Sequence, residues 1–95
     1  MSRAGAAAEI RKVWIGEYLV AGFPARLAIY GLGSCVGLLL HDPPAHLSAL
    51  GHILLPQPPG SGPTTHPGRF ASTAVPAMVE ALREAGGEPR RLIAN

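Results

Sequence analysis

The chain has 95 residues with a single cysteine, 15% charged side chains and a formal net charge of +2. This length predicts one domain, and a single cysteine excludes an internal disulfide framework and any thiolate cluster for zinc or iron–sulfur. The small net charge, without a basic stripe interleaved with aromatic residues, argues against a nucleic-acid-binding protein.

No segment has the pattern of a membrane span or a signal peptide. The longest uncharged apolar stretch, Leu27 to Leu40, is shorter than the roughly 20 residues that a transmembrane helix needs. Three charged residues, Glu9, Arg11 and Lys12, interrupt the N-terminal stretch where the apolar core of a signal peptide would lie. We therefore expect a cytoplasmic protein whose thiol is reduced.

The first part of the chain predicts strands. Residues 1–11 are rich in alanine and are expected to form a flexible tail ahead of a single domain over residues 12–95. Val13 to Val20 is dominated by β-branched and aromatic residues, which predicts one strand or two strand pieces bent around Gly16. Leu27 to Tyr30 alternates large and small residues and predicts a second strand.

Two more strands are predicted in the middle of the chain, and a long loop follows them. Val36 to Leu40 is a continuous apolar run, and Leu47 to Leu55 is a second one that ends at Pro56. The next segment, Gln57 to Gly68, contains four prolines and three glycines. This composition excludes regular structure and predicts a loop.

One helix is predicted over Ser72 to Ala85, where apolar residues recur at helical spacing. Thr73 is the expected N-cap, because it would place Pro76 in the first turn, where a missing N–H costs little. The pair Gly86-Gly87 is expected to end the helix. Arg91 to Ala94 then predicts the start of another strand.

The most informative stretch is GLGSCVG at residues 31–37. Glycines around Cys35 let the backbone turn sharply and let a substrate carbonyl approach it closely. Backbone N–H groups near Gly33 and Ser34 would then face the same space as the sulfur, which outlines a thiol nucleophile beside an oxyanion hole. The alternative is a small, packed and unreactive Cys35, which is common for free cysteines but needs no surrounding glycines.

His52 lies seventeen residues after Cys35, in the segment LSALGHILLP. Pairing of the two adjacent strands would bring these residues side by side. An imidazolium beside the sulfur stabilises the thiolate and then protonates the leaving group; as a single histidine among leucines, His52 would otherwise be structural. The four histidines lack metal-ligand spacing, so we expect no metal site.

Four segments carry a resemblance to a known family. VWIGEYLVA, GLGSCVGLLLHDP, ALGHILLP and ASTAVPAMVEAL occur in that order and spacing, and over roughly residues 13–94 the chain resembles CheD, the chemoreceptor glutamine deamidases. The cysteine and the histidine of the family motif fall on Cys35 and His52. The resemblance implies an α+β fold of mixed β-sheets layered with helices, a cysteine hydrolase fold like that of deamidating toxins.

The resemblance also implies a reaction and partners. The reaction is hydrolysis of selected glutamine side chains on chemotaxis receptors to glutamate and ammonia, without a cofactor. Cys35 would be the nucleophile and His52 the base and acid. The receptors would be the substrates, and the CheC phosphatase would be a further partner.

Two features depart from the family pattern. The family usually has a threonine six residues before the cysteine, where its hydroxyl helps to orient the histidine, and this chain has Ile29 there. Loss of an orienting group slows such reactions, so Ile29→Thr is expected to raise activity. Family members also continue past the position of Asn95, so we expect a partial domain that is incomplete at its C-terminus. These departures leave an alternative open: a non-catalytic shortened relative that binds receptors or CheC.

Overall fold

Four strands form the central sheet of the protein. The structure, a computed structural model, describes residues 9–31, 33–57, 60 and 66–95. The sheet has the order β2-β5-β4-β6, and all neighbouring strands are antiparallel. Its strands are β2 (Tyr18–Gly22), β4 (Val36–Asp42), β5 (Leu47–Ile53) and β6 (Ile93–Ala94).

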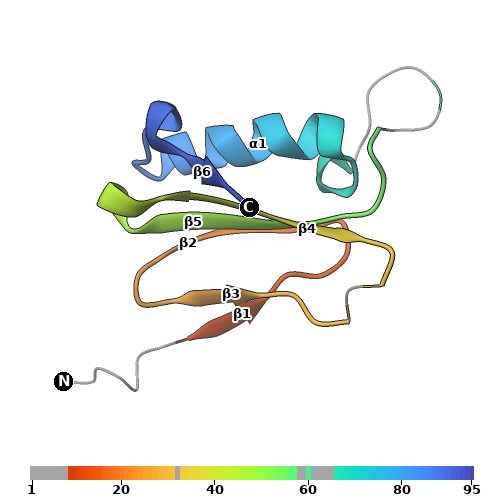
Figure 1. Ribbon diagram of the computed structural model, residues 1–95, viewed down its shortest axis with the longest axis horizontal. Helices are drawn as coiled ribbons and strands as arrows, with labels where there is room; N and C mark the ends of the chain where they lie inside the picture. Colours follow the sequence, from red (N-terminus) through yellow and green to blue (C-terminus); the bar gives the residue numbers. More distant parts are fainter. Residues whose placement is uncertain (1–8, 32, 58–59, 61–65) are drawn as a thin grey trace.

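A helix and a second pair of strands lie on opposite sides of this sheet (Figure 1). The helix α1 (Ala71–Glu84) runs along one face, and β1 (Ile10–Lys12) and β3 (Arg26–Ala28) lie on the other side. β1 and β3 pair in parallel, whereas the central sheet is antiparallel. The predicted α+β fold of mixed β-sheets layered with helices is confirmed, with α1 as the one α-helix of the described residues.

The core lies between α1 and the central sheet. Side chains at alternate positions of a strand share one face, and Ala49 and Ile53 of β5 are buried with Met78 and Leu82 of α1. Gly51 lies between them on the same face, and a Cβ there would come within 2.8 Å of the Met78 sulfur. Burying each large side chain contributes about 1.5–3 kcal/mol, so these contacts hold α1 against the sheet.

The predicted N-terminal tail ends earlier than expected. Residues 1–8 lie outside the described residues, but Ile10 and Arg11 belong to β1. The Arg26 N–H donates to the Glu9 carbonyl at 2.7 Å, so pairing with β3 orders this part of the backbone. All three residues of β1 are exposed. Strand formation here therefore depends on the partner strand rather than on burial of an apolar face.

The strand predicted over Val13 to Val20 is a turn followed by a strand. β2 starts only at Tyr18, and the turn before it contains Gly16 at φ +82°, a left-handed conformation that suits glycine. The sequence therefore predicted the bend at Gly16 correctly, but the residues before it are not a strand. The second predicted strand is β3, which ends at Ala28.

The middle of the chain matches its predicted strands. β4 and β5 are both present and are joined by the 3₁₀ turn η2 (Pro43–Ala45). Of the predicted loop Gln57–Gly68, residues 58–59 and 61–65 lie outside the described residues. The end of this loop belongs to a second 3₁₀ turn, η3 (Pro67–Arg69).

The predicted N-cap of the helix is wrong. The N-cap is Phe70, and α1 starts one residue before its predicted first residue. The N–H groups of Ala71 and Ser72 donate to the carbonyls of Leu55 and Pro56, both at 2.9 Å. These groups have no partner within a helix. The extended segment after β5 satisfies them, so no side-chain cap is needed and the helix begins earlier.

Thr73 is not the N-cap of α1; its hydroxyl instead binds a carbonyl of η3. It lies inside the first turn, where its hydroxyl donates to the Pro67 carbonyl at 2.6 Å and so ties α1 to η3. Pro76 consequently lies beyond the first turn. The end of the helix is as predicted: Gly86 has φ +110°, and its N–H donates to the Arg83 carbonyl.

Asp42, the last residue of β4, anchors the C-terminal segment. Its carboxylate is fully buried and accepts hydrogen bonds from the Arg91 guanidinium at 2.8 and 2.9 Å and from the Glu88 N–H at 2.8 Å. The Arg91 guanidinium holds the pKa of Asp42 at about 2, and the Glu88 N–H assists, although desolvation acts in the opposite direction. Arg91 belongs to the 3₁₀ turn η4 (Pro89–Arg91), so the ion pair places β6 beside β4.

The predicted strand at the end of the chain is present in shortened form, as β6. Among the described residues, α1 is the longest helix at 14 residues, and none has the length and apolar character of a membrane span.

Candidate active site

Cys35 lies directly before β4, the strand that pairs with the strand of His52. Gly37 is directly opposite His52 in the β4–β5 ladder. Side chains two residues apart share a face of a strand, so an extended backbone that continues one residue before Val36 would place Cys35 on the same side of the sheet as Gly37 and His52. This side faces away from α1, toward β1 and β3. The strand pairing that the sequence predicts for these two segments is confirmed.

The backbone around Gly37 brings the two strands close together at this point. The Leu39 N–H donates to the Asn95 carbonyl at 2.9 Å, and the Asn95 N–H donates back at 2.8 Å, so Leu39 and Gly37 direct their backbone groups away from β5. Opposite residues without ladder hydrogen bonds have Cα atoms only about 4.5 Å apart. Cys35 lies one residue before this ladder begins, at the end where Val36 pairs with Ile53.

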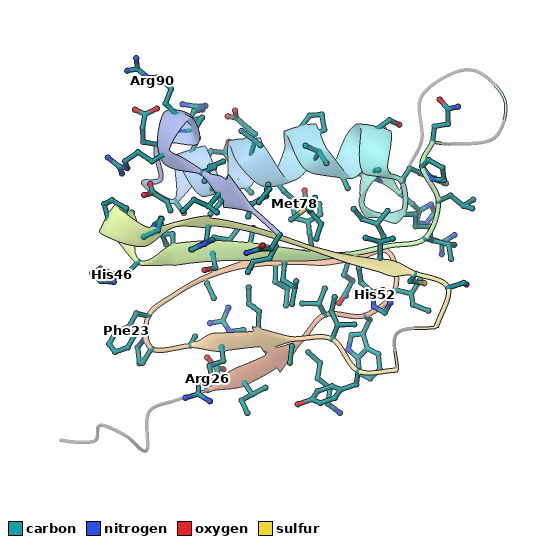
Figure 2. All side chains as sticks on the ribbon, viewed as in Figure 1. Phe23, Arg26, His46, His52, Met78 and Arg90 are labelled. Atoms are coloured by element: carbon teal, nitrogen blue, oxygen red, sulfur yellow. The ribbon has the colours of Figure 1, made fainter. Side chains whose placement is uncertain are left out.

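The His52 side chain is almost fully buried, with 3% of its surface exposed. Figure 2 shows it pointing from the central sheet toward the layer of β1 and β3. Its Nδ1 lies 3.2 Å from the Val13 carbonyl oxygen. Since a carbonyl only accepts, Nδ1 carries the proton and donates. Nε2 is then a lone-pair acceptor, and it is buried without a hydrogen-bond partner among the described residues.

The turn before β2 holds His52 from the backbone as well. The Gly16 N–H donates to the His52 carbonyl at 2.8 Å, and the His52 N–H donates to the Glu17 carbonyl at 2.9 Å. Val13 is itself buried, and its N–H donates to the Ala28 carbonyl of β3. The imidazole is therefore oriented by the segment from Val13 to Glu17, whose backbone is hydrogen-bonded to β3 at one end and to β5 at the other.

Sequence reasoning missed Val13. The contact uses a main-chain carbonyl, which every residue carries, so no residue type could have indicated it. The predicted orienting position, Ile29, is half-buried directly after β3 and has no group that could bond the imidazole.

The predicted oxyanion residues directly precede Cys35 in the chain. Gly33 and Ser34 lie in an exposed bend, and Cys35 itself is half-buried. Ser34 also lines a cleft of about 450 Å³ whose remaining walls are mostly apolar side chains, among them Val36, Leu54 and Val75. The backbone N–H groups near Cys35 thus remain the predicted oxyanion donors.

The other histidines do not join this site. His46 lies at the opposite end of the molecule from His52 (Figure 2), and together with His41 it lines a separate cleft. His66 accepts a hydrogen bond from the Arg69 N–H through its carbonyl. Within the described ranges of the chain, no three His, Cys, Asp or Glu side chains are grouped closely enough to hold a metal ion.

Known proteins are similar in sequence to this chain over most of its length. The chain is 44% identical over 88 residues to a probable chemoreceptor glutamine deamidase CheD of Desulforamulus reducens, an alignment that covers 93% of this chain and 52% of that protein. This chain is a CheD homologue. It is 42% identical over 83 residues to the chemoreceptor glutamine deamidase CheD of Thermotoga maritima, with 87% and 52% covered. A probable CheD of Archaeoglobus fulgidus is 44% identical over 83 residues, with 87% and 51% covered.

The resemblance to CheD predicted from four segments is thus confirmed. The chain spans about half the length of the curated CheD relatives that it matches. No protein-family model matches the chain.

Proposed function

We propose that this CheD homologue deamidates glutamine side chains of chemotaxis receptors, with Cys35 as nucleophile and His52 as general base and acid. The observation that carries the proposal is the state of His52: Nδ1 is bonded to the Val13 carbonyl, and Nε2 is buried without a partner among the described residues. An imidazole in this tautomer can accept a proton at Nε2 on the sheet face that Cys35 shares. The relatives' names as chemoreceptor glutamine deamidases support the substrate.

In the first half of the proposed reaction, Nε2 of His52 takes the proton of the Cys35 thiol. The sulfur attacks the side-chain amide carbon of the glutamine, and a C–S bond forms. The carbonyl oxygen becomes an oxyanion, for which the backbone N–H groups near Gly33 and Ser34 are the proposed donors. The imidazolium then gives its proton to the amide nitrogen, the C–N bond breaks and ammonia leaves.

The second half regenerates the enzyme. Nε2 of His52 removes a proton from a water molecule, and the water oxygen attacks the thioester carbon. The C–S bond breaks, the Cys35 sulfur takes back the proton and the glutamate side chain is released. Atoms and electrons balance with water as the only co-reactant, so the scheme needs no cofactor.

The Val13 carbonyl supplies an orienting group for this scheme. A hydrogen bond to one ring nitrogen selects the tautomer and keeps the other nitrogen available. In this chain a main-chain carbonyl does so, and the hydroxyl that Ile29 lacks is not required for that purpose.

The proposal includes a partner and a compartment. CheC phosphatase is a proposed partner, from the resemblance to the family. The cytoplasm is the proposed compartment, where the thiol of Cys35 would stay reduced.

The test is to incubate the purified chain with a receptor fragment and to search receptor peptides by mass spectrometry for the conversion of glutamine to glutamate. Cys35→Ala is expected to abolish conversion, and His52→Gln to slow it by about 10² or more. His46→Ala, at the other end of the molecule, is the matched control and is expected to react like the parent.

The alternative function is a non-catalytic module that binds receptors or CheC; it applies if the threonine hydroxyl of the family, absent at Ile29, has a task other than orienting the imidazole. Receptor binding without any glutamine conversion by the parent chain would support this alternative and overturn the enzymatic proposal. Conversion that persists in Cys35→Ala would overturn the proposed mechanism.

A further inference from the structure

A third cleft has His52 in its lining. It has a volume of about 260 Å³, and its lining includes Lys12, Trp14, Tyr30 and Gly31 besides His52. Pockets for drug-sized ligands have about 300–1,000 Å³. This cleft is therefore suited to a single side chain rather than to a larger molecule.

Lys12 is held at this cleft by two aromatic rings. Its ammonium nitrogen lies 5.5 Å from the ring centroid of Trp14 and 5.6 Å from that of Tyr30, within the range of cation–π attraction. Trp14 and Tyr30 are 63% and 61% exposed. The side chains that form ion pairs within the described residues do not include Lys12: they are Glu9 with Arg11, Glu80 with Arg83, Glu88 with Arg90, and Asp42 with Arg91.

Two polar side chains line the cleft, Lys12 and His52. The Lys12 ammonium lies against the two aromatic rings and carries three hydrogen-bond donors. The Nε2 of His52 is a buried acceptor without a partner in the described part of the chain. Buried polar atoms are nearly always hydrogen-bonded, so an unsatisfied one that lines a cleft points to a ligand group that completes it. A ligand that satisfies both groups has a donor for the imidazole and an anionic group for the ammonium.

We propose that Lys12, held between Trp14 and Tyr30, binds a carboxylate of the protein substrate that lies close in sequence to the target glutamine. This inference rests on the proposed deamidase function and adds a specificity-determining residue to it. The cleft admits one side chain, so the glutamine amide reaches His52 while the neighbouring carboxylate stays at the aromatic mouth. Trp and Tyr are also the residue types that dominate protein-binding hot spots, which favours a peptide carboxylate over a small inorganic anion.

Trp14 is the only tryptophan of the chain, so its fluorescence reports on this site directly. The probes are two blocked peptides, acetyl-Ala-Glu-Gln-Glu-Ala-amide and acetyl-Ala-Ser-Gln-Ser-Ala-amide, titrated against the full chain carrying Cys35→Ser so that no turnover occurs. We expect both to change Trp14 emission, and the acidic peptide to bind about fivefold more tightly at low salt.

Variants of Lys12 test whether the peptide preference depends on the positive charge of this side chain. Lys12→Gln is expected to reduce the fivefold preference to about one, and Lys12→Arg to retain it, because a guanidinium also pairs with carboxylates and stacks on aromatic rings. Arg90→Gln is the matched control: Arg90 is an exposed cation on η4, far from His52 (Figure 2), and its replacement is expected to keep the preference.

The outcomes distinguish this proposal from the function on which it rests. Equal affinities for the two peptides, a preference that survives Lys12→Gln, or no fluorescence response to either peptide would overturn the carboxylate site. If the parent chain deamidates receptors but shows no preference, only the carboxylate site is wrong. A Lys12-dependent preference without any deamidation would support the carboxylate site and count against the enzymatic proposal.

Discussion

The Nδ1 atom of His52 lies 3.2 Å from the carbonyl oxygen of Val13, a residue 39 positions earlier in the chain. The contact determines which ring nitrogen carries the proton, and it leaves Nε2 unpartnered among the described residues. The carbonyl belongs to a turn whose backbone also bonds the backbone of His52, so ring and main chain are oriented together.

The first prediction concerns this tautomer. We expect the ¹⁵N spectrum of the neutral protein to show His52 protonated at Nδ1, because the Val13 carbonyl can only accept a hydrogen bond. The exposed His46 provides the internal reference for a histidine without this contact. A His52 ring protonated at Nε2 would contradict the assigned hydrogen bond.

The second prediction concerns the reactivity of Cys35. His52→Ala is expected to slow the alkylation of Cys35 by iodoacetamide at neutral pH by about tenfold, because the thiolate loses its neighbouring imidazole. The chain has a single cysteine, so the modified mass measures this site alone. His46→Ala is the control, and an alkylation rate that is the same in both variants would remove His52 from the mechanism.

The third prediction concerns Ile29. The family comparison alone predicts that Ile29→Thr raises activity, but the Val13 carbonyl already bonds Nδ1. We therefore expect the rate of glutamine conversion to change by less than about threefold, which corresponds to less than 1 kcal/mol. A gain of about tenfold or more would mean that the carbonyl alone does not orient the imidazole.

The fourth prediction concerns the ion pair of Asp42 and Arg91. The pKa of Asp42 is lowered to about 2 in the folded protein, so the folded carboxyl binds a proton less readily than the unfolded one. The contribution of the pair to the free energy of unfolding is then complete above about pH 4, and it is lost as the pH falls from there toward 2.

Denaturant unfolding of Arg91→Met measures this contribution. The variant is expected to be less stable than the parent at pH 7, because it leaves the buried carboxylate of Asp42 without its counter-ion. The difference should shrink between pH 4 and pH 2 as Asp42 is protonated. Arg90→Met, which removes an exposed neighbour, is the control. A difference that does not depend on pH would contradict the role of Asp42.

The fifth prediction concerns the contact of α1 with β5 at Gly51. Gly51→Ala is expected to lower the free energy of unfolding by about 1–3 kcal/mol, because the new methyl group would displace the Met78 sulfur. In a Met78→Ala background the same change is expected to cost less, which a double-mutant cycle would show. Gly33→Ala, which meets no atom within 4 Å, is the control and should stay within about 0.5 kcal/mol. Additive costs in the cycle would contradict the contact.

Several elements could be predicted from local patterns because burial dictates them. β4 and β5 are apolar runs separated by a proline turn, and a short connection of this kind makes neighbouring strands antiparallel. That hairpin places the segment of Cys35 beside the strand of His52. The helical repeat likewise predicted α1, since its apolar stripe has to cover the sheet.

The remaining features depend on groups that the sequence does not distinguish. β1 is exposed and exists through its pairing with β3. The start of α1 is determined by the carbonyls of Leu55 and Pro56, and Asp42, which precedes two prolines in the sequence, is the partner of Arg91, 49 residues away. Each of these contacts joins segments that are distant in the chain, and two of the three use main-chain atoms.

The residue types of this chain were sufficient to predict its class of chemistry, because thiol, imidazole and glycine have distinctive reactivity and conformational freedom. The tautomer of the neutral His52 ring depends on the folded backbone, which brings the Val13 carbonyl to Nδ1 and leaves Nε2 to accept a proton in the proposed reaction. The chemistry of a side chain can be recognised from its residue type. A main-chain carbonyl is the same at every position, so its role depends on where the fold places it.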